Sequence, residues 1–224
     1  MSDEVLGPGP HTRVRRLADK ARYDRTTIEA VIDEARLCHV AGVVNGRATA
    51  LATLHAREGG ALYLHGSQSN ALLKSVLEVG EACVSMTLYD GLRLARSGFE
   101  SSIAYRSVVL FGPAVEVVDE AEKRRVLELF VDAVLAGRAR EVRAASDQEL
   151  RLTMVVRVTI DEASAKVSAG PTEDFEEDLE LPIWSGTIPA RLHFGEPVPS
   201  TDGAMASGEV PLPASVQRLY DQQT

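Results

Sequence analysis

The sequence predicts a mostly β domain with flanking helices, in which short antiparallel strands close into a barrel. Short apolar runs, many of them rich in Val, Ala and Thr, recur between residues 39 and 162. Asn45-Gly46 and Asp90-Gly91 separate neighbouring runs, and such dipeptides are the strongest short hairpin signals. No Gly-rich phosphate loop of the Rossmann or P-loop type occurs, which argues against a parallel nucleotide-binding sheet.

The expected elements follow in order along the chain. The first helix is expected over residues 25–37, where apolar residues recur at helical spacing from Ile28 to Ala35 and Thr26 or Thr27 provides the cap. Seven strand-like runs then follow, at residues 39–44, 47–56, 61–66, 82–90, 92–98, 104–119 and 152–162.

Two further helices and one bend are expected between these runs. Residues 62–80 begin as an alternating strand and end as an amphipathic helix. Residues 120–137 carry the strongest helical pattern, with Asp119 as the cap and Gly137 as the stop. Gly112-Pro113 interrupts a long β-rich run and predicts a bulge or bend, because proline cannot donate to the ladder.

Composition divides the chain into three parts. Residues 1–24 are expected to form a flexible N-terminal arm, residues 25–170 the barrel domain, and residues 171–224 an acidic, proline-rich C-terminal extension. Six of the eight residues at 173–180 are acidic, which is typical of a solvated segment. Trp184 is the expected anchor of the extension, because burying an indole offsets part of the cost of ordering it.

Bulk properties exclude several classes of partner. The net charge of −9 and the pI of about 5.1 argue against binding to nucleic acid or an anionic membrane. No run approaches the length of a membrane span and no signal peptide is evident, so a cytoplasmic location is expected. Cys38 and Cys83 lie in apolar runs without Cys or His partners, so two buried thiols and no metal site are expected.

The polar turn between the strand and the helix of residues 62–80 is the first candidate site. A turn that opens a helix offers free backbone N–H groups and the positive end of the helix dipole, which suit a phosphate. The alternative interpretation is that Ser69 is a plain helix cap and Lys74 a solvated side chain. The candidate residues are His65, Gly66, Ser67, Ser69, Asn70 and Lys74.

Two single residues add to the candidate site. Alternation places His65 with Tyr63, opposite Leu62 and Leu64, so it is either a hydrogen-bonding structural residue or a catalytic one. Arg106 opens a β-branched run, where it requires either an anionic ligand or a salt bridge at the sheet edge.

The order of these motifs resembles the FMN-binding split-barrel superfamily of pyridoxamine 5′-phosphate oxidase. Within it, the sequence is most similar to the flavin-nucleotide-binding branch related to the nitroimidazole-resistance reductases. The resemblance covers about residues 12–197, and it rests on residues 21–35, 62–74, 90–112, 120–137, 164–171 and 181–189.

This resemblance implies a six-stranded antiparallel split barrel and a homodimer with FMN at the interface. It implies that the turn at residues 65–70, with Lys74, holds the flavin phosphate and that Thr49 runs alongside the isoalloxazine. Arg106 and Ser107 fall where the superfamily places flavin contacts, from the same chain or from the partner. The substrate-binding Arg/His motif of the oxidase is absent from residues 164–171, so pyridoxamine phosphate is not the expected substrate.

The implied function is an FMN-dependent oxidoreductase acting on a small planar organic substrate, with NADH or NADPH as candidate electron donor. His65 is the expected proton donor, and its reference pKa near 6.5 suits that task. Two alternatives remain open: a flavin- or haem-binding protein without turnover, and a dimeric interaction module without a cofactor.

Overall fold

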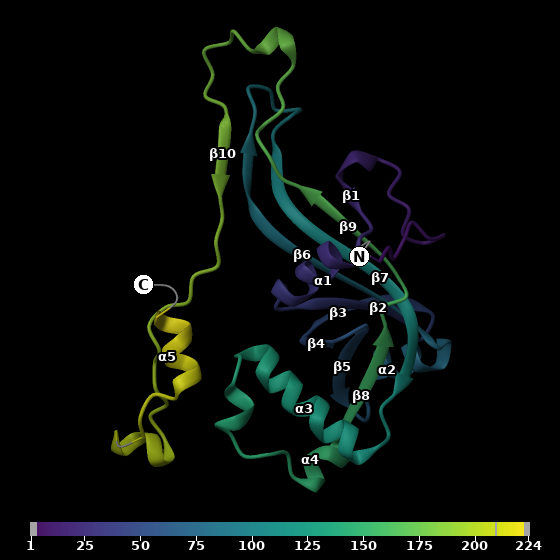
Figure 1. Ribbon diagram of the computed structural model, residues 1–224, viewed down its shortest axis with the longest axis vertical. Coiled ribbons are helices and arrows are strands. Elements are labelled where there is room, and N and C mark those ends of the chain that lie inside the picture. Colours follow the sequence, from purple (N-terminus) through teal and green to yellow (C-terminus); the bar gives the residue numbers. More distant parts are fainter. Residues whose placement is uncertain (1–3, 209, 222–224) are drawn as a thin grey trace.

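The computed structural model describes residues 4–208 and 210–221, with ten strands and five α-helices among them (Figure 1). The strands are β1 (Ala21–Arg22), β2 (Cys38–Val44), β3 (Arg47–Thr53), β4 (His55–Glu58), β5 (Ala61–Ser67), β6 (Glu81–Leu94), β7 (Ser102–Glu116), β8 (Thr153–Thr159), β9 (Glu162–Ser168) and β10 (Gly186–Pro189). The α-helices are α1 (Arg25–Glu34), α2 (Ala71–Val79), α3 (Glu120–Val134), α4 (Asp147–Leu152) and α5 (Ala214–Asp221). The 3₁₀ turns are η1 (Ala18–Lys20), η2 (Arg138–Arg140), η3 (Glu176–Asp178) and η4 (Gly203–Ser207).

The strands form one antiparallel barrel-like sheet in the order β3-β2-β6-β7-β8-β5-β4, with β9 on β7, β1 on β9 and β10 on β6. The fold class predicted from the sequence is confirmed. The strand count is ten rather than six, because the run expected at 47–56 is divided into β3 and β4 and because β1, β9 and β10 are added. Loops and short segments thus contribute strands that a period-2 pattern does not reveal.

Gly112-Pro113, where the sequence predicts a bulge or bend, is the place where β7 changes partners on one edge, while its ladder with β6 continues through both residues without a register shift. Residues up to Phe111 pair with β9, whereas pairing with β8 begins at Ala114. A Cβ on Gly112 would lie 1.7 Å from the carbonyl oxygen of Thr159, so only glycine allows the two backbones to approach so closely.

The hairpin predicted at Asp90-Gly91 is wrong. β6 runs through both residues, and the ladder with β7 merely shifts register between Tyr89 and Gly91. Gly91 has φ of 144°, and a Cβ there would lie 2.2 Å from the carbonyl oxygen of Ile188 in β10. The glycine therefore serves a bulge and a close approach of strands rather than a tight turn.

Two apolar clusters lie on opposite faces of β5. Leu62 and Leu64 point into the barrel interior against Ile28 of α1, whereas Tyr63 points toward Phe130 of α3. The alternation predicted for this strand is confirmed, because neighbouring residues of β5 belong to two different apolar clusters.

The helix caps differ in part from those expected. Asp24 caps α1 by accepting the N–H of Thr27 at 2.8 Å, and Asn70 rather than Ser69 caps α2. Asp119 caps α3 as predicted. The N-cap is the residue directly before the first helical residue, which is Asp24 for α1 and Asn70 for α2. Thr26 and Thr27 lie inside α1 and therefore cannot cap it.

The described part of the N-terminal arm lies along the barrel. Leu6 is buried, and the backbone N–H groups of His11 and Thr12 each donate to the Glu162 carboxylate at 2.9 Å. Strand β1 then pairs with β9. The residues expected to form a flexible arm therefore have specific contacts with the barrel from residue 4 onward. Cys38 is buried as predicted, and burial raises the pKa of its thiol to about 12, whereas Cys83 is only half-buried.

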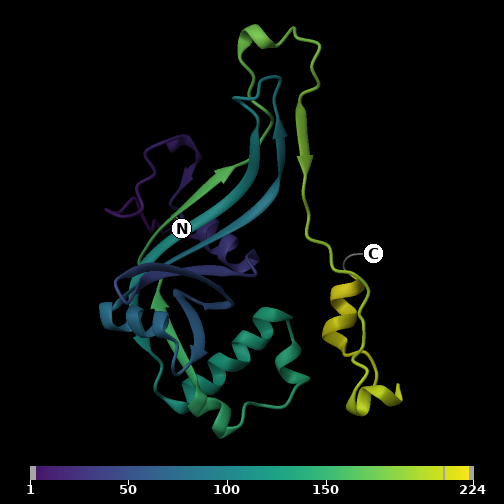
Figure 2. The same cartoon turned by 180° about the vertical axis from the view of Figure 1, so that it is seen from behind.

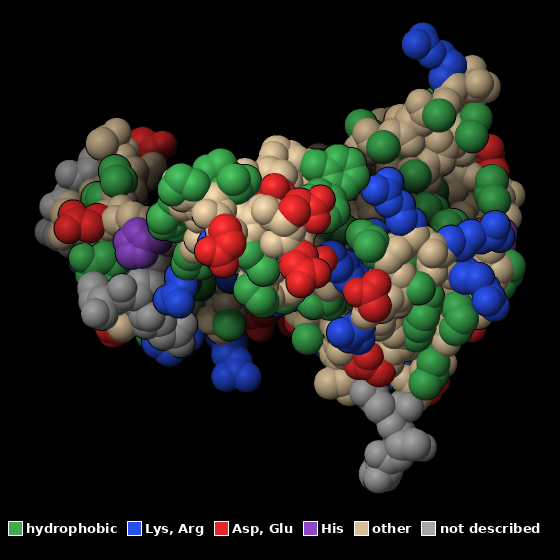
Figure 3. Space-filling view, turned by 90° about the horizontal axis from the view of Figure 1, so that it is seen from above, with side chains coloured by type: hydrophobic (Ala, Val, Ile, Leu, Met, Phe, Trp, Pro, Cys, Tyr) green, Lys and Arg blue, Asp and Glu red, His purple; other side chains and the backbone are tan. Residues whose placement is uncertain are grey.

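The C-terminal extension wraps the tip of the β6–β7 hairpin and returns along the molecule as β10 (Figures 1 and 2). Its anchor is not Trp184, which is 66% exposed, but Asp174, whose carboxylate accepts the backbone N–H and the guanidinium of Arg96 at 2.6 and 2.7 Å. Farther on, Ser215 of α5 donates to Glu141. Seen from above, acidic and apolar side chains intermingle over this end of the molecule (Figure 3). In the described part of the chain, no helix is long and apolar enough to cross a membrane.

Candidate functional site

A groove of about 670 Å³ opens between the edge strand β3 and the start of α2, and we call it the β3–α2 groove. It includes two of the residues predicted to touch a flavin, Thr49 and Asn70. Its lining residues are Val44, Asn45, Arg47, Ala48, Thr49, Ala50, Leu51, Asn70, Ala71 and Leu72.

The first turn of α2 gives the groove its polarity. The Asn70 side-chain oxygen accepts the N–H of Leu73 at 3.0 Å, and the backbone N–H of Asn70 donates to the carbonyl of Ser67 at 2.9 Å. Ala71 and Leu72 line the groove directly, at the helix end where N–H groups lack intrahelical acceptors. The positive end of the dipole at this terminus favours an anionic group.

The turn before Asn70 is compact but faces solvent. Ser67 and Ser69 share a hydrogen bond between their hydroxyls at 3.0 Å, and both residues are exposed. A Cβ on Gly66 would lie 2.9 Å from Nδ2 of Asn70 and 3.0 Å from Cδ1 of Leu73. Gly66 is therefore needed for the close packing of β5 against α2, which is a structural reason for a residue predicted as a phosphate contact.

The opposite wall of the groove is an edge strand with free donors. Thr49 donates its hydroxyl to the carbonyl of Arg47 at 3.2 Å, and it is half-buried. Arg47 is exposed and makes no ion pair with any residue that the structure describes. Leu51 is 49% exposed although it lies on the core-facing side of β3. The wall combines apolar surface with an unpaired guanidinium.

Lys74 is exposed on α2, one turn after Asn70, and it makes no ion pair with a described residue. It does not line the groove in this arrangement of the side chains. The flexible four-carbon side chain would allow its ammonium group to reach the groove. Contact between Lys74 and a ligand in the groove therefore stays a prediction.

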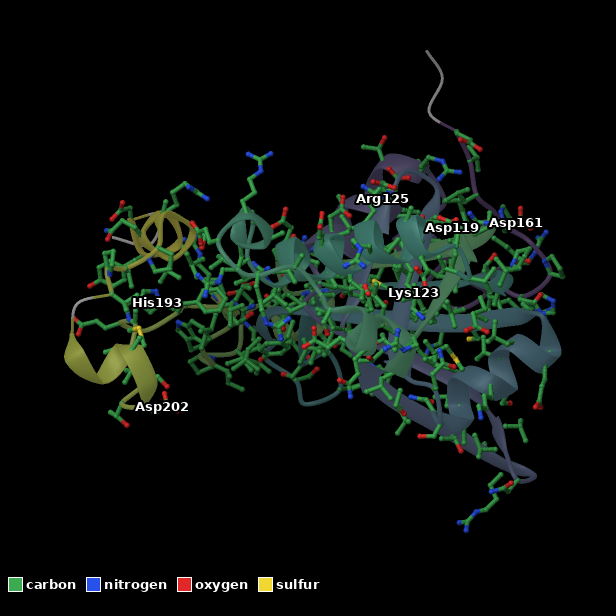
Figure 4. The ribbon with its side chains drawn as sticks, turned by 90° about the horizontal axis from the view of Figure 1, so that it is seen from below. Asp119, Lys123, Arg125, Asp161, His193 and Asp202 are labelled. Atoms are coloured by element: carbon green, nitrogen blue, oxygen red, sulfur yellow. The ribbon has the colours of Figure 1, made fainter. Side chains whose placement is uncertain are left out.

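His65 lies on the other face of β5, away from the groove. Its ring stacks at a tilt on Phe130 of α3, with 4.3 Å between centroids, and its Nδ1 is buried without a hydrogen-bond partner among the described residues. Burial lowers the pKa of the imidazole below its usual value. Helix α3, identified in Figure 4 by Asp119, Lys123 and Arg125, thus covers the imidazole. The structure does not bring His65 together with Thr49 and Asn70, and its catalytic role stays a prediction.

A second hollow, of about 700 Å³, lies at a gap in the edge of β6, and we call it the β6-edge pocket. Strand β2 pairs with β6 up to Ser85 and β10 pairs from Gly91 onward, so residues 86–90 have no strand partner on this edge among the described strands. The pocket is lined by Glu34, Arg36, Leu37, His39, Thr87, Leu88, Tyr89, Asp90, Arg106, Ala190, Arg191, Leu192 and Phe194.

Arg106 lies in this pocket, within a closed set of ion pairs. Its guanidinium donates to the Asp90 carboxylate at 2.8 and 2.9 Å and to the Glu34 carboxylate at 2.5 and 2.8 Å. The pKa of Arg106 is raised, first by Asp90 and then by Glu34, and its hydrogen bond lowers the pKa of Glu34. The salt-bridge interpretation of Arg106 is confirmed. Ser107, on the opposite side of β7, is half-buried between Thr87 and Lys166 in the ladder.

Sequence reasoning missed His39, Arg36 and Arg191 in this pocket. His39 is exposed between the buried Cys38 and Val40, and no described residue hydrogen-bonds to it. Arg191 makes no ion pair with a described residue, and Arg36 lies 6.0 Å from the ring centroid of Phe194. The pocket brings together residues some 150 positions apart in the sequence, so their proximity cannot be read from neighbouring residues. The local sequence offers only Arg36 and Arg191, each beside a leucine, as a signal of a polar and apolar site.

The described residues contain no group of three His, Cys, Asp or Glu side chains placed to hold a metal ion by themselves. The lining residues of the two hollows suit organic ligands, in one through a helix N-terminus and in the other through arginines, an imidazole and apolar walls.

Comparison with known proteins gives close and extensive similarities. The chain is 37% identical to flavocytochrome Anf3 from Azotobacter vinelandii, with a TM-score of 0.87 over 94% of this chain and 96% of that one. It is 34% identical to a FAD- and haem-binding protein from Mycobacterium smegmatis, with a TM-score of 0.83 over 89% and 97%. A candidate 5-nitroimidazole antibiotic resistance protein from Bacteroides thetaiotaomicron shares the fold at 22% identity and a TM-score of 0.56, over 66% and 86%. A search of curated proteins finds no matching relative.

The profile of the pyridoxamine 5′-phosphate oxidase family matches residues 24–167, which span α1 to β9 and include every residue predicted to touch a flavin. The antiparallel barrel, its order of elements and this match agree with one another. The chain belongs to the pyridoxamine 5′-phosphate oxidase family, within the FMN-binding split-barrel superfamily.

Proposed function

We propose that this protein is a flavin-binding oxidoreductase that holds its flavin in the β3–α2 groove. The observation that carries the proposal is the open N-terminus of α2, whose residues Ala71 and Leu72 line a groove of about 670 Å³ beside an edge strand. That volume is within the usual range for a cofactor site, and the helix end suits a phosphate. The two relatives that match nearly the whole chain, one a flavocytochrome and one a FAD- and haem-binding protein, support a flavin.

The proposed nucleotide is FMN or FAD, which share the ring, the ribityl chain and the first phosphate. The family resemblance favours FMN. The Mycobacterium smegmatis relative, 97% of which is covered by the match, favours FAD. Chromatography of the nucleotide released by heat distinguishes the two, because only FAD carries the adenylate.

A bound flavin would supply hydride and single-electron chemistry toward a small planar organic substrate, with NADH or NADPH as donor. The chain's own contribution is position and charge. The first turn of α2 would hold the phosphate, with Lys74 reaching it from the next turn, and Thr49 would offer its hydroxyl along the opposite wall. Leu51 would cover one face of an aromatic ring system.

The proposed assembly is a homodimer that completes this groove. The outward face of β2 and β3 is built of small and apolar side chains, such as Ala41, Ala48 and Ala50, and Val43 on the same face is 59% exposed. β3 is also an edge strand, which leaves one row of backbone groups without a partner in the described sheet. A second copy seated there would cover the open side of the groove. Light scattering of the purified protein, with a mass near 24.2 kDa for a monomer or twice that for a dimer, tests this.

A second cofactor, haem, is the candidate that the β6-edge pocket favours. The pocket holds one exposed imidazole, three arginines and several apolar side chains, which are the groups that a haem requires. Of the two relatives that match nearly the whole chain, one is called a flavocytochrome and the other a FAD- and haem-binding protein. A protein with both cofactors would pass electrons between a two-electron and a one-electron centre.

The first experiment is an absorption spectrum of the purified protein, followed by a spectrum of the nucleotide released on heating. A flavin band that follows the protein supports the proposal, and a Soret band supports the second cofactor. A colourless protein that fails to bind added FMN and FAD would overturn the flavin function.

Lys74→Ala then tests the location of the phosphate. We expect flavin binding to weaken by about 1–3 kcal/mol, the usual size of a charge-assisted hydrogen bond. Lys20→Ala, a change on η1 far from the groove in the chain, is the matched control and should leave flavin affinity unchanged. Equal affinities for both variants would remove Lys74 from the phosphate site.

A further inference from the structure

We propose that His39 would hold the iron of a haem bound in the β6-edge pocket, and that Arg36 and Arg191 would hold its propionates. The inference rests on the haem component of the proposed function, and it assigns that component to named residues. Haem iron in proteins is commonly held by one histidine, and a single imidazole with four porphyrin nitrogens needs no cluster of protein ligands.

The position of His39 carries the assignment. Strand β2 alternates, with Cys38 and Val40 buried, so the imidazole of His39 points out of the barrel into the pocket. No described residue hydrogen-bonds to it, which leaves a ring nitrogen available to a metal. The other described histidines do not line the pocket: His55 is hydrogen-bonded to the carbonyl of Ile32, His65 packs on α3 and His11 on Phe111. His193 lies between the lining residues Leu192 and Phe194 in the sequence but does not itself line the pocket.

The walls of the pocket suit a flat apolar ring. Leu37, Tyr89, Leu192 and Phe194 line it and are 56%, 53%, 72% and 38% exposed, a concentration of large apolar surface in one place. Such surface beside a cavity marks a binding site rather than ordinary solvent-facing residues. The edge of β6 is open at residues 86–89, because β2 ends at Ser85 and the carbonyl of Asp90 accepts the N–H of Ala190 at 2.9 Å. A planar ligand can therefore lie against the strand at these residues.

The charges of the lining suit two carboxylates. Three arginines face two carboxylates, so the lining has a net charge of +1 in a chain whose net charge is −9. Glu34 and Asp90 are already paired with Arg106, which leaves Arg36 and Arg191 as the lining cations without a carboxylate partner among the described residues. Arg36 donates one N–H to the carbonyl of Ala133 at 3.4 Å, and its guanidinium has further donors for an anionic ligand. Guanidinium groups bind carboxylates with two parallel hydrogen bonds, and this is the contact that propionates require.

The pocket also lies close to the flavin groove in the fold. Strands β2 and β3 form one hairpin in which His39 pairs with Ala52, and Thr49 of the groove is three residues away from Ala52. One hairpin therefore carries a wall of each hollow. Two cofactors placed in this way would be neighbours without sharing a site.

The test is a titration of the full-length protein with ferric haem, followed by the Soret band. We expect the wild-type protein to bind one haem per chain with the spectrum of a histidine-ligated iron. His39→Ala should lose that spectrum, and added imidazole should restore it by filling the vacated position. His193→Ala is the matched control, because His193 lies on the extension between two lining residues but does not itself line the pocket (Figure 4). Arg191→Ala should keep the spectrum and weaken haem affinity about tenfold, as expected for one charge-assisted hydrogen bond.

The outcomes separate the failures. If wild-type protein binds haem and His39→Ala keeps the same spectrum, the ligand assignment is overturned while the haem function stands. If the wild-type protein binds flavin but no haem, both the haem function and the His39 assignment are overturned and the flavin function stands. Displacement of the flavin by added haem would overturn the assignment of two separate sites. Retention of flavin by His39→Ala serves as the folding control, and His39→Gln, which keeps the polarity of the side chain, should also lose the spectrum.

Discussion

The β3–α2 groove and the β6-edge pocket have similar volumes, about 670 and 700 Å³, but opposite chemistry. The groove obtains its polarity mainly from the backbone of a helix start and from the Asn70 amide and the Thr49 hydroxyl, with Arg47 as its one lining cation among the described residues. The pocket obtains its polarity from charged side chains, with Arg106 bound between two carboxylates and two further arginines beside an imidazole.

This difference teaches how one sheet can offer two sites. Backbone N–H groups cannot titrate and are already aligned by the helix, so they suit a phosphate at any physiological pH. Long arginine side chains and an imidazole are adjustable and suit a ligand with carboxylates and a metal. Substitutions that act on one hollow should therefore leave the other intact.

The largest expected effect comes from Arg106→Met. The change leaves Glu34 and Asp90 close together without their cation, and we expect the free energy of unfolding at pH 7 to fall by about 2 kcal/mol. This value lies between the roughly 1 kcal/mol of an exposed pair and the 3–5 kcal/mol lost when a buried pair is broken. Arg125→Met, which removes an exposed pair with Glu58, is the matched control and should cost less than about 1 kcal/mol.

The pH dependence sharpens this prediction. In the wild-type protein Arg106 lowers the pKa of Glu34, so the pairing stabilises the fold above the usual glutamate pKa of about 4.3 and is lost as the pH falls through the lowered value. The difference between wild type and Arg106→Met should thus shrink below about pH 4. Denaturant unfolding at several pH values measures it, and a constant difference would contradict the ion-pair explanation.

The next effect distinguishes the groove from the pocket through Asn70. Asn70→Asp keeps a good N-cap, so stability should be nearly unchanged, but it places a negative charge where the flavin phosphate would lie. We expect flavin affinity to fall about tenfold and haem affinity to remain the same. Asn70→Ala should in addition cost about 1 kcal/mol of stability through loss of the cap. Calorimetric titration with each cofactor tests the separation, and an equal loss of both affinities would contradict it.

The sequence predicts features that depend on residues close together in the chain better than features that depend on residues far apart. Alternation within residues 61–67 correctly separated Leu62 and Leu64 from Tyr63, and a helix start after residue 69 was evident, because both depend on neighbours. Thr49 and Asn70 line one groove, and their contact with a flavin stays a prediction.

Long-range contacts explain what was missed. The Asp90-Gly91 pair gives the same local signal for a hairpin as for a bulge, and the decision depends on Ile188, almost one hundred residues later. His39 looks like any solvent-facing residue of a short strand until residues 190–194 close the pocket around it. Trp184 stays exposed for a related reason. Asp174, which accepts hydrogen bonds from Arg96 and Ser185, holds the extension through contacts that the local sequence does not reveal.

A smaller effect is expected from Thr49→Val, which keeps the shape of the side chain and removes its hydroxyl. We expect flavin binding to weaken by about 0.5–1 kcal/mol, the net value of one neutral hydrogen bond, and haem binding to be unchanged. Thr53→Val, on the same strand and outside the groove, is the control. If both valine variants bind flavin as the wild type does, the hydroxyl of Thr49 is not a flavin contact.

The smallest effect concerns His65, which belongs to neither hollow. Burial lowers its pKa, so the unfolded chain takes up a proton below about pH 6.5 that the folded chain resists, and stability should fall as the pH decreases from there. His65→Gln removes this proton uptake, so the decline between about pH 6.5 and 5 should become shallower by less than about 1 kcal/mol, with the remainder from the buried His55. A His65→Gln variant with an unchanged slope but strongly reduced turnover of the flavin-loaded protein would instead support the catalytic role that the sequence suggested, and would mean that α3 moves away from the imidazole during the reaction.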